Sequence, residues 1–307
     1  MKRSMRAGLD FTLTPLGPCF GALITDIDLT GLDAPTFTRL YDAWLEYALL
    51  IFPAQHLRPE DQIRFARRFG ELEFDIAPLS NVREDGRLRP DDDSDDMVKV
   101  LRGNMGWHAD STYMPLQAKG AVFSARVVPS SGGETEWADM RAAHAALGDD
   151  LRERIVPLSA HHSLRHSQAK LGHVQESAQD SKDAGGRPAR KSEYSGYGFH
   201  DEPPPLRPIV KVHPETGRPS ILIGRHAYGI PGLTTDASER LLDELLELAC
   251  QSPRIHRHHW RPGDVVLWDN RCLLHRGLPW DMNEPRVMLH SRIAGDPRSE
   301  GGIELPA

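Results

Sequence analysis

Cysteine is scarce in this sequence. Three cysteines, Cys19, Cys250 and Cys272, are spread over 307 residues. A disulfide framework or a cysteine-rich zinc module needs more cysteines at closer spacing, so the composition argues against both. Free cysteines in this number are typical of the reducing cytoplasm, where we expect the protein to be located.

Long apolar runs and basic clusters are lacking too. The longest apolar stretch, Tyr47–Phe52, is far shorter than the roughly 20 residues of a membrane-spanning helix. The N-terminal segment 1–15 begins with basic side chains, but Asp10 interrupts it and it has no apolar core, so we expect no signal peptide. The net charge of −7 is distributed along the chain rather than concentrated in a cationic surface. We therefore expect neither a membrane nor a nucleic-acid partner.

Three segments have the pattern of amphipathic helices. The first has apolar residues at helical spacing between Phe37 and Ala48. The second begins at Pro59, a residue favoured at the first helical position, and ends at Phe69 before a glycine. The third begins at Asp236, which we expect to cap a helix that runs to Ala249.

Short β-rich segments bounded by glycine or proline make up much of the rest. The clearest are Ala121–Val128, Ile209–Val212, Ser220–Ile223 and Val265–Trp268. Helices at the start, with strands and turns in the middle and at the end, favour a β-sandwich or jelly roll with flanking helices over alternating strands and helices. We expect one domain over residues 1–307.

Two polar segments, 83–96 and 176–195, have too few apolar residues to offset the entropy of ordering. Both are interpreted as mobile loops. They are either plain surface or lids over an active site, and the sequence leaves both readings open.

Pairs of histidine and an acidic residue two positions apart can offer two ligands to one metal from an extended segment. With 15 histidines and 44 acidic residues, about two such pairs are expected from random placement. Three are present: His108/Asp110, His200/Glu202 and His213/Glu215. The motif alone therefore decides nothing.

Local context favours the first pair. His213 opens a Pro-Glu-Thr-Gly segment typical of a hairpin turn, and Glu202 leads into three prolines. His108 and Asp110 instead have aromatic and apolar neighbours, and a partly buried aspartate needs a counter-charge such as a metal.

A third ligand must come from elsewhere in the chain. His256, His258 and His259 lie close together, but the pattern around them favours a solvated strand with Trp260 turned inward. His275 follows an apolar strand and is the other candidate. Two imidazoles and one carboxylate are the ligand set of Fe(II) oxygenases.

Three longer motifs carry a family resemblance. They are WHADSTYMP at 107–115, SSGGETEWADMRAA at 130–143 and GDVVLWDNRCLLHRG at 263–277. In this order and spacing, with Arg286 downstream, they resemble the TauD/TfdA group of dioxygenases. The resemblance implies a double-stranded β-helix, which is a cupin-like jelly roll. It also implies Fe(II), 2-oxoglutarate as cosubstrate, and O2.

The resemblance assigns roles to individual residues. It implies that His108, Asp110 and His275 hold iron, that Thr135 and Arg286 bind 2-oxoglutarate, and that Trp260 lies beside it. An arginine suits the distal carboxylate because its guanidinium can grip both oxygens.

Within the group the chain looks most like the enzymes that cleave phenoxyalkanoate ethers, especially the (S)-selective phenoxypropionate type. His290 stands where sulfonate-using members carry an arginine, so a sulfonate substrate is disfavoured. The candidates for lining the substrate pocket or holding the acid group of the substrate are Lys99, Asn104, Tyr197, Arg207 and Arg225.

The predicted reaction hydroxylates the carbon next to the ether oxygen and yields a phenol, a 2-oxoacid, succinate and CO2. Two alternatives stay open: a family member that acts on a sulfonate, an alkyl sulfate or another small acid, and a metal-binding cupin-like module without oxygenase activity. We expect a small acidic molecule as the binding partner, and a homo-oligomer.

Overall fold

The computed structural model describes residues 11–92, 94–172, 198 and 202–304. Its helices are α1 (Ala34–Tyr47), α2 (Pro59–Arg67), α3 (Asp96–Gly103), α4 (Met140–Ala145), α5 (Asp149–Ile155), α6 (Leu164–Lys170), α7 (Thr235–Ala249) and α8 (Pro297–Glu300). None of the helices in the described ranges is long and apolar enough to cross a membrane.

The strands are β1 (Thr12–Pro15), β2 (Ala22–Thr25), β3 (Leu49–Phe52), β4 (Leu72–Ser80), β5 (Gly120–Val127), β6 (Thr135–Asp139), β7 (Ser159–His162), β8 (Leu206–Pro208), β9 (Val210–Val212), β10 (Pro219–Ile221), β11 (Ala227–Tyr228), β12 (Ile255–His258), β13 (Val265–Asp269), β14 (Leu273–Gly277) and β15 (Val287–Ile293).

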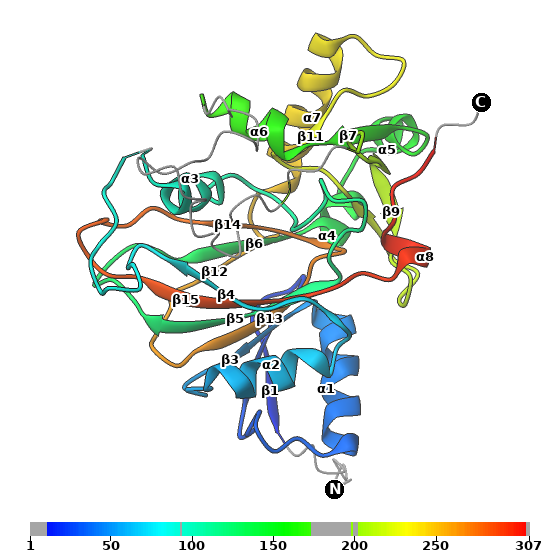
Figure 1. Cartoon of the computed structure of the whole chain (residues 1–307). Helices are drawn as coiled ribbons and strands as arrows, with labels where there is room; N and C mark the ends of the chain where they lie inside the picture. Colours follow the sequence, from blue (N-terminus) through cyan, green and yellow to red (C-terminus); the bar gives the residue numbers. More distant parts are fainter. Residues whose placement is uncertain (1–10, 93, 173–197, 199–201, 305–307) are drawn as a thin grey trace, which may run out of the picture.

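Two sheets lie one above the other at the centre of the molecule (Figure 1). The larger sheet has the strand order β1-β2-β3-β13-β5-β15-β4, and the smaller has the order β12-β6-β14. An antiparallel bridge between His108 and His275 adds the segment around His108 to the free edge of β14. These sheets and the helices around them confirm the expectation of a mainly-β fold with flanking helices.

Alternation along the central strand β13 explains how the larger sheet is buried on both faces. Val265 and Leu267 point to the face covered by α1 and α2, where they pack with Trp44. Val266 and Trp268 point to the opposite face, toward the smaller sheet. Successive side chains of a strand alternate between faces, so a strand covered on both sides is continuously apolar.

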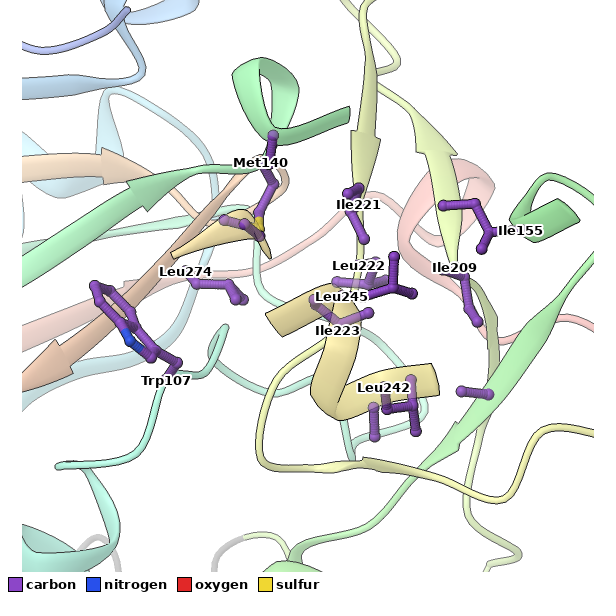
Figure 2. Packing of buried hydrophobic residues seen from close by; sticks show 14 of the residues in the cluster. Trp107, Met140, Ile155, Ile209, Ile221, Leu222, Ile223, Leu242, Leu245 and Leu274 are labelled. Atoms are coloured by element: carbon purple, nitrogen blue, oxygen red, sulfur yellow. The ribbon is translucent and has the colours of Figure 1, made fainter. Parts of the chain in front are cut away.

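The outer face of the smaller sheet is covered by a second apolar cluster (Figure 2). In it, Leu274 of β14 packs with side chains of α7, such as Leu245, and with Ile221 of β10. Because Leu274 points outward into this cluster, its neighbour His275 must point inward, between the two sheets.

Most predicted elements agree with the structure to within two residues, but the start of α7 was wrong. The side chain of Thr234, not of Asp236, caps this helix and accepts a hydrogen bond from the backbone N–H of Ala237. Thr234 has extended backbone angles, as a capping residue requires, whereas Asp236 lies in the first turn.

The turn predicted around His213 is confirmed. It joins β9 to β10, and the N–H of Gly217 donates to the carbonyl of His213. Part of the predicted loop 83–96 is a hairpin in which Arg83 and Arg89 bind Asp95, the capping residue of α3. The second predicted loop, 176–195, lies outside the described residues.

Candidate active site

Three side chains converge between the sheets. The backbones of His108 and His275 exchange two hydrogen bonds, His108 N to His275 O at 3.0 Å and His275 N to His108 O at 2.8 Å. Asp110 is two residues beyond His108 on this extended segment, so its side chain returns to the same side. One ligand atom from each of the three residues lies within 4.8 Å of the other two, and all three residues are buried.

Asn270 fixes the backbone at Asp110. Its side-chain oxygen accepts from the N–H of Asp110 at 2.7 Å, and its amide nitrogen donates to the carbonyl of Asp110 at 2.9 Å. Asn270 is itself buried just after β13. Asn270, which follows β13 of the larger sheet, thus fixes the segment that carries His108 and Asp110, and this segment is itself bridged to β14 of the smaller sheet.

The protonation states of the triad suit a metal. Burial lowers the pKa of His108 well below its usual range, an effect that neighbouring His275 strengthens, and burial lowers the pKa of His275 to about 3. Burial alone would raise the pKa of Asp110, but the neighbouring Arg292, His290 and His108 together outweigh it and the pKa is lowered. Two neutral imidazoles and one carboxylate result, which is the facial set used for Fe(II).

Individual atoms in the triad point to the same chemistry. Nδ1 of His108 lies 2.8 Å from the carbonyl oxygen of Gly106 and donates to it, which leaves Nε2 with a lone pair for a metal. Oδ2 of Asp110 is buried and accepts no hydrogen bond from any described residue, and it lies 3.9 Å from Nε2 of His275. A buried carboxylate oxygen without a donor is costly, and a metal ion bound to it would remove this cost. The residues fit an iron ion.

Thr135 and Trp260 form a buried polar pair on the inner side of the smaller sheet. The indole N–H of Trp260 donates to the hydroxyl oxygen of Thr135 at 2.9 Å. Because that oxygen already accepts, the hydroxyl hydrogen of Thr135 is available to donate to a ligand.

Arg286 is a buried cation whose surroundings call for an anion. Its side chain has no ion pair among the residues described, although it is only 5% exposed. Its Nε donates to the carbonyl of Gly133 at 3.2 Å, and its guanidinium carbon lies 5.1 Å from the ring centre of Trp280. Burial lowers the pKa of Arg286 to about 10, so it stays charged at neutral pH.

Glycine is needed at position 133 for this arrangement. A Cβ there would lie 3.0 Å from Nε of Arg286, and the backbone φ of +69° disfavours other residues. Gly133, the second glycine of the Gly-Gly pair in the sequence, therefore leaves the space that the side chain of Arg286 occupies.

The predicted substrate residues fall into different surroundings. Arg207 is buried and donates to the carbonyls of Thr112, Met114 and Glu300, so it fastens the segment after Asp110 to the C-terminal region. Lys99 forms an ion pair with Asp96 one turn earlier in α3. The structure thus gives both cations a structural partner.

Arg225 differs from these two. It is half-buried, and this partial burial lowers its pKa to about 10. Its Nη2 donates to the hydroxyl of Ser167 at 3.4 Å, and no ion pair of Arg225 occurs in the described ranges. Its guanidinium lies so close to Gly103 that a Cβ there would meet Nη1 at 2.5 Å, and its charge contributes to the lowered pKa of His108.

The two remaining candidates give less information. Asn104 is half-buried, and its carbonyl accepts from Gly277 at the end of β14. Tyr197 lies outside the described residues, as does His200.

A second cluster, His213, Asp269 and Cys272, also has ligand atoms close together. Nε2 of His213 lies 3.0 Å from Asp269, while its Nδ1 accepts from the backbone N–H of Glu215. Asp269 also binds Arg271 through both oxygens. Because these atoms are already satisfied, the cluster is an internal ion network that anchors the β9–β10 turn.

The pattern predicted around β12 is confirmed only in part, because Trp260 is turned inward but His256 and His258 are partly buried rather than solvated. His258 pairs with Asp264, His259 is largely exposed beside Glu134, and Trp260 is buried.

Sequence reasoning missed Asn270 and Arg292, both of which contact Asp110. Arg292 lies in β15, whose register is irregular between His290 and Arg292, so simple alternation along the strand was not a usable signal for it. Asn270 lies within the motif at 263–277, but nothing in that motif indicated a contact with Asp110.

Comparisons with known proteins define the class. Residues 12–292 match the model of the family described as Taurine catabolism dioxygenase TauD, TfdA family. The chain belongs to this family.

Among curated proteins, it is 61% identical to (S)-phenoxypropionate/alpha-ketoglutarate-dioxygenase of Sphingobium herbicidovorans, over 95% of this chain and 98% of that protein. It is 35% identical to alpha-ketoglutarate-dependent 2,4-dichlorophenoxyacetate dioxygenase of Cupriavidus pinatubonensis, over 92% and 97% of the respective chains. Among solved structures, AAD-2 in complex with Mn(II) and N-oxalylglycine superposes with a TM-score of 0.84 at 32% identity, covering 96% of this chain and 99% of that one. The resemblance inferred from the three motifs is confirmed.

Proposed function

We propose that this protein is an Fe(II)- and 2-oxoglutarate-dependent dioxygenase that cleaves aryloxyalkanoate ethers of the phenoxypropionate type. The observation that carries the proposal is the buried His-Asp-His triad together with Arg286, a buried cation without an acidic partner among the described residues. The identity of 61% to a phenoxypropionate dioxygenase over nearly the whole chain supports the substrate class.

His108, Asp110 and His275 would hold the iron, which supplies O2 activation when bound. Arg286 would grip the distal carboxylate of 2-oxoglutarate, and Thr135 would donate its hydroxyl hydrogen to the same group. The protein's part is to hold the cosubstrate and one C–H bond of the substrate in a fixed relation.

The net reaction inserts one oxygen atom of O2 into the C–H bond next to the ether oxygen. The other oxygen atom enters succinate, which forms from 2-oxoglutarate with loss of CO2. The hydroxylated carbon then carries both an ether oxygen and a hydroxyl. Its C–O ether bond breaks, the hydroxyl proton passes to the leaving phenolate, and the products are a phenol and a 2-oxoacid.

Arg225 is the best-supported residue for binding the acid group of the substrate. It is a half-buried cation near His108 without an ion pair in the part of the chain that is described, whereas Arg207 and Lys99 are engaged elsewhere. His290, in place of an arginine, lies 3.6 Å from Asp110 and leaves this task to another cation.

Substrate profiling tests the function. The purified protein with Fe(II), ascorbate and 2-oxoglutarate is offered (S)- and (R)-2-phenoxypropionate, phenoxyacetate, taurine and an alkyl sulfate, while succinate and phenol are quantified. We expect equal amounts of succinate and phenol with a phenoxy acid. Faster turnover of taurine or the alkyl sulfate would contradict the substrate class, and absence of succinate with every acid would support a non-catalytic metal-binding module.

Several finer features are part of the same proposal. The two facing sheets would be the halves of a double-stranded β-helix, in one domain that spans residues 1–307. A homo-oligomer and a cytoplasmic location remain predictions, which light scattering and cell fractionation can test.

A further inference from the structure

Arg292 lies beside the acidic member of the triad. It is buried on β15, and its Nη2 donates to Oδ1 of Asp110 at 2.9 Å. Its Nη1 donates to the hydroxyl of Ser111 at 3.2 Å, and its guanidinium carbon lies 4.9 Å from the ring centre of Phe74. The guanidinium plane is thereby held between two hydrogen-bond acceptors and an aromatic face.

This contact makes the two oxygens of Asp110 inequivalent. Oδ1 accepts from Arg292, while Oδ2 is buried without a donor among the described residues and lies 3.9 Å from Nε2 of His275. Asn270 holds the backbone of Asp110 on both its N–H and its carbonyl. With backbone and one oxygen fixed, the carboxylate can turn only one oxygen toward the ion.

We infer that Arg292 is a positioning residue that keeps Asp110 a one-oxygen ligand of the metal. Two imidazoles and a single carboxylate oxygen leave three of six positions open around an octahedral ion. A chelating 2-oxoacid needs two of these positions and O2 needs the third. If both oxygens of Asp110 bound the metal, one of the three positions would be lost.

Arg292 differs in this respect from the two arginines proposed as ligand cations. Its donors are occupied by Asp110 and Ser111, and its Nε lies 3.9 Å from Glu73. Arg286 and Arg225 have no ion pair within the described ranges. A cation already committed to a carboxylate is a poor binding site for a second acid, so Arg292 acts on the metal ligand rather than on the substrate.

The inference rests on the iron site of the proposed function, and its test uses Mn(II) as the probe ion. Mn(II) is bound to the wild type and to the variants Arg292→Met and Arg292→Lys, and the exchangeable waters per bound ion are counted by water-proton relaxation. The affinity of N-oxalylglycine for each Mn(II) form is measured by calorimetry. Neither readout depends on turnover.

We expect about three waters in the wild type and about two in Arg292→Met, whose Asp110 is free to bind through both oxygens. N-oxalylglycine should bind Arg292→Met about 10 to 100 times more weakly, the usual effect of removing a partner of a metal ligand. Arg292→Lys keeps the charge and one donor, and should lie between the two.

Arg141→Met is the matched control. Arg141 is buried and binds both oxygens of Asp139 at the start of α4, so its removal also breaks a buried arginine–aspartate pair. Asp139 is not a member of the triad. We expect the water count and the N-oxalylglycine affinity of the wild type in this variant.

The outcomes separate the two claims. If the wild type does not bind Mn(II), the proposed function fails. If the wild type binds it and both Arg292 variants keep the wild-type water count and affinity, the role of Arg292 is refuted and the proposed function is untouched. Should Arg292→Met not fold, a crystal structure of the wild type with Mn(II) decides, because two-oxygen binding by Asp110 overturns the inference and binding through Oδ2 alone supports it.

Discussion

The indole of Trp260 orients the hydroxyl of Thr135. The two residues are 125 positions apart in the sequence, yet the N–H of Trp260 donates to Oγ1 of Thr135 at 2.9 Å in a buried setting. The donation occupies the lone-pair side of the hydroxyl and turns its hydrogen outward. A threonine that would contact 2-oxoglutarate is therefore set in advance as a donor.

Trp260→Phe should weaken the binding of 2-oxoglutarate. The substitution keeps an aromatic ring but removes the hydrogen bond to Thr135, which is worth about 1 kcal/mol, so we expect the KM for 2-oxoglutarate to rise about 5-fold. Trp44→Phe is the control, because the indole nitrogen of Trp44 has no hydrogen-bond partner in the described structure. Equal KM values in the two variants would contradict the role of Trp260.

Arg286→Met should change which 2-oxoacid the protein accepts. Loss of charge-assisted hydrogen bonds of about 1.5–3 kcal/mol predicts an affinity for 2-oxoglutarate about 10 to 100 times lower. A 2-oxoacid with an apolar tail should lose far less, because it has no distal carboxylate to bind. Competition between the two acids, followed by calorimetry, measures the shift, and a uniform loss for both would argue against the assignment.

Gly133→Ala should act in the same direction as Arg286→Met, through geometry alone. The new Cβ would lie 3.0 Å from Nε of Arg286, and the left-handed φ of +69° adds strain. We expect a raised KM for 2-oxoglutarate with the guanidinium still present. Gly217→Ala, also at positive φ but with open space around it, is the control for backbone strain.

Arg225→Met should raise the KM for the aryloxy acid about 10-fold and leave the KM for 2-oxoglutarate within about 2-fold, because a charge pair with the acid group of the substrate would be lost at a half-buried site. Lys99→Met removes a cation already paired with Asp96 and should leave both KM values unchanged. A parallel rise of both KM values in Arg225→Met would place this residue outside the substrate pocket.

His162 should make the protein sensitive to acid. It is fully buried, neither ring nitrogen has a hydrogen-bond partner among the described residues, and burial lowers its pKa from 6.5 to about 3. Between these values the unfolded chain binds the proton and the folded protein does not. Its contribution to stability is therefore present above pH 6.5 and is lost as the pH falls toward 3.

Between pH 7.5 and pH 5 the free energy of unfolding of the wild type should fall by about 2 kcal/mol more than that of the variant His162→Leu. Urea unfolding of both proteins at both pH values measures this difference. At pH 7.5 the two proteins should differ by about 1 kcal/mol or less, since the imidazole makes no hydrogen bond that leucine would sacrifice. His259→Leu, at a largely exposed position, should keep the pH dependence of the wild type. An unchanged slope in His162→Leu would show that other groups dominate.

Local pattern in the sequence was sufficient for much of the fold. The apolar run at β13 and the proline at the first position of α2 each predicted their element, because backbone geometry and side-chain pattern act over a few residues. The cap of α7 was misplaced because Thr234 and Asp236 are both good capping residues. Only the backbone angles at Thr234 distinguish them.

The candidate iron site was less accessible from the sequence. A histidine and an acidic residue two positions apart occur near the chance frequency in this chain. Local context and then the resemblance to a family, rather than the pair itself, selected His108 and Asp110 over the pair at His213. The structure supplies a physical reason for the difference: both nitrogens of His213 are already bonded, whereas Oδ2 of Asp110 is not.

The sequence by itself determined the residue types that can bind iron and a dicarboxylate, and their order along the chain. The tertiary structure decided which of the arginines already have a carboxylate partner within the protein. Arg292 is paired with the carboxylate of Asp110, and Arg207 donates to three backbone carbonyls. Arg286 and Arg225 each have one hydrogen bond, to the carbonyl of Gly133 and the hydroxyl of Ser167, and no ion pair in the described residues. These hydrogen bonds and ion pairs join segments that are far apart in the chain, and no periodicity in the sequence predicts them. The triad of His108, Asp110 and His275 could be named from motifs, but the one-oxygen orientation of Asp110 comes from Arg292, 182 residues away.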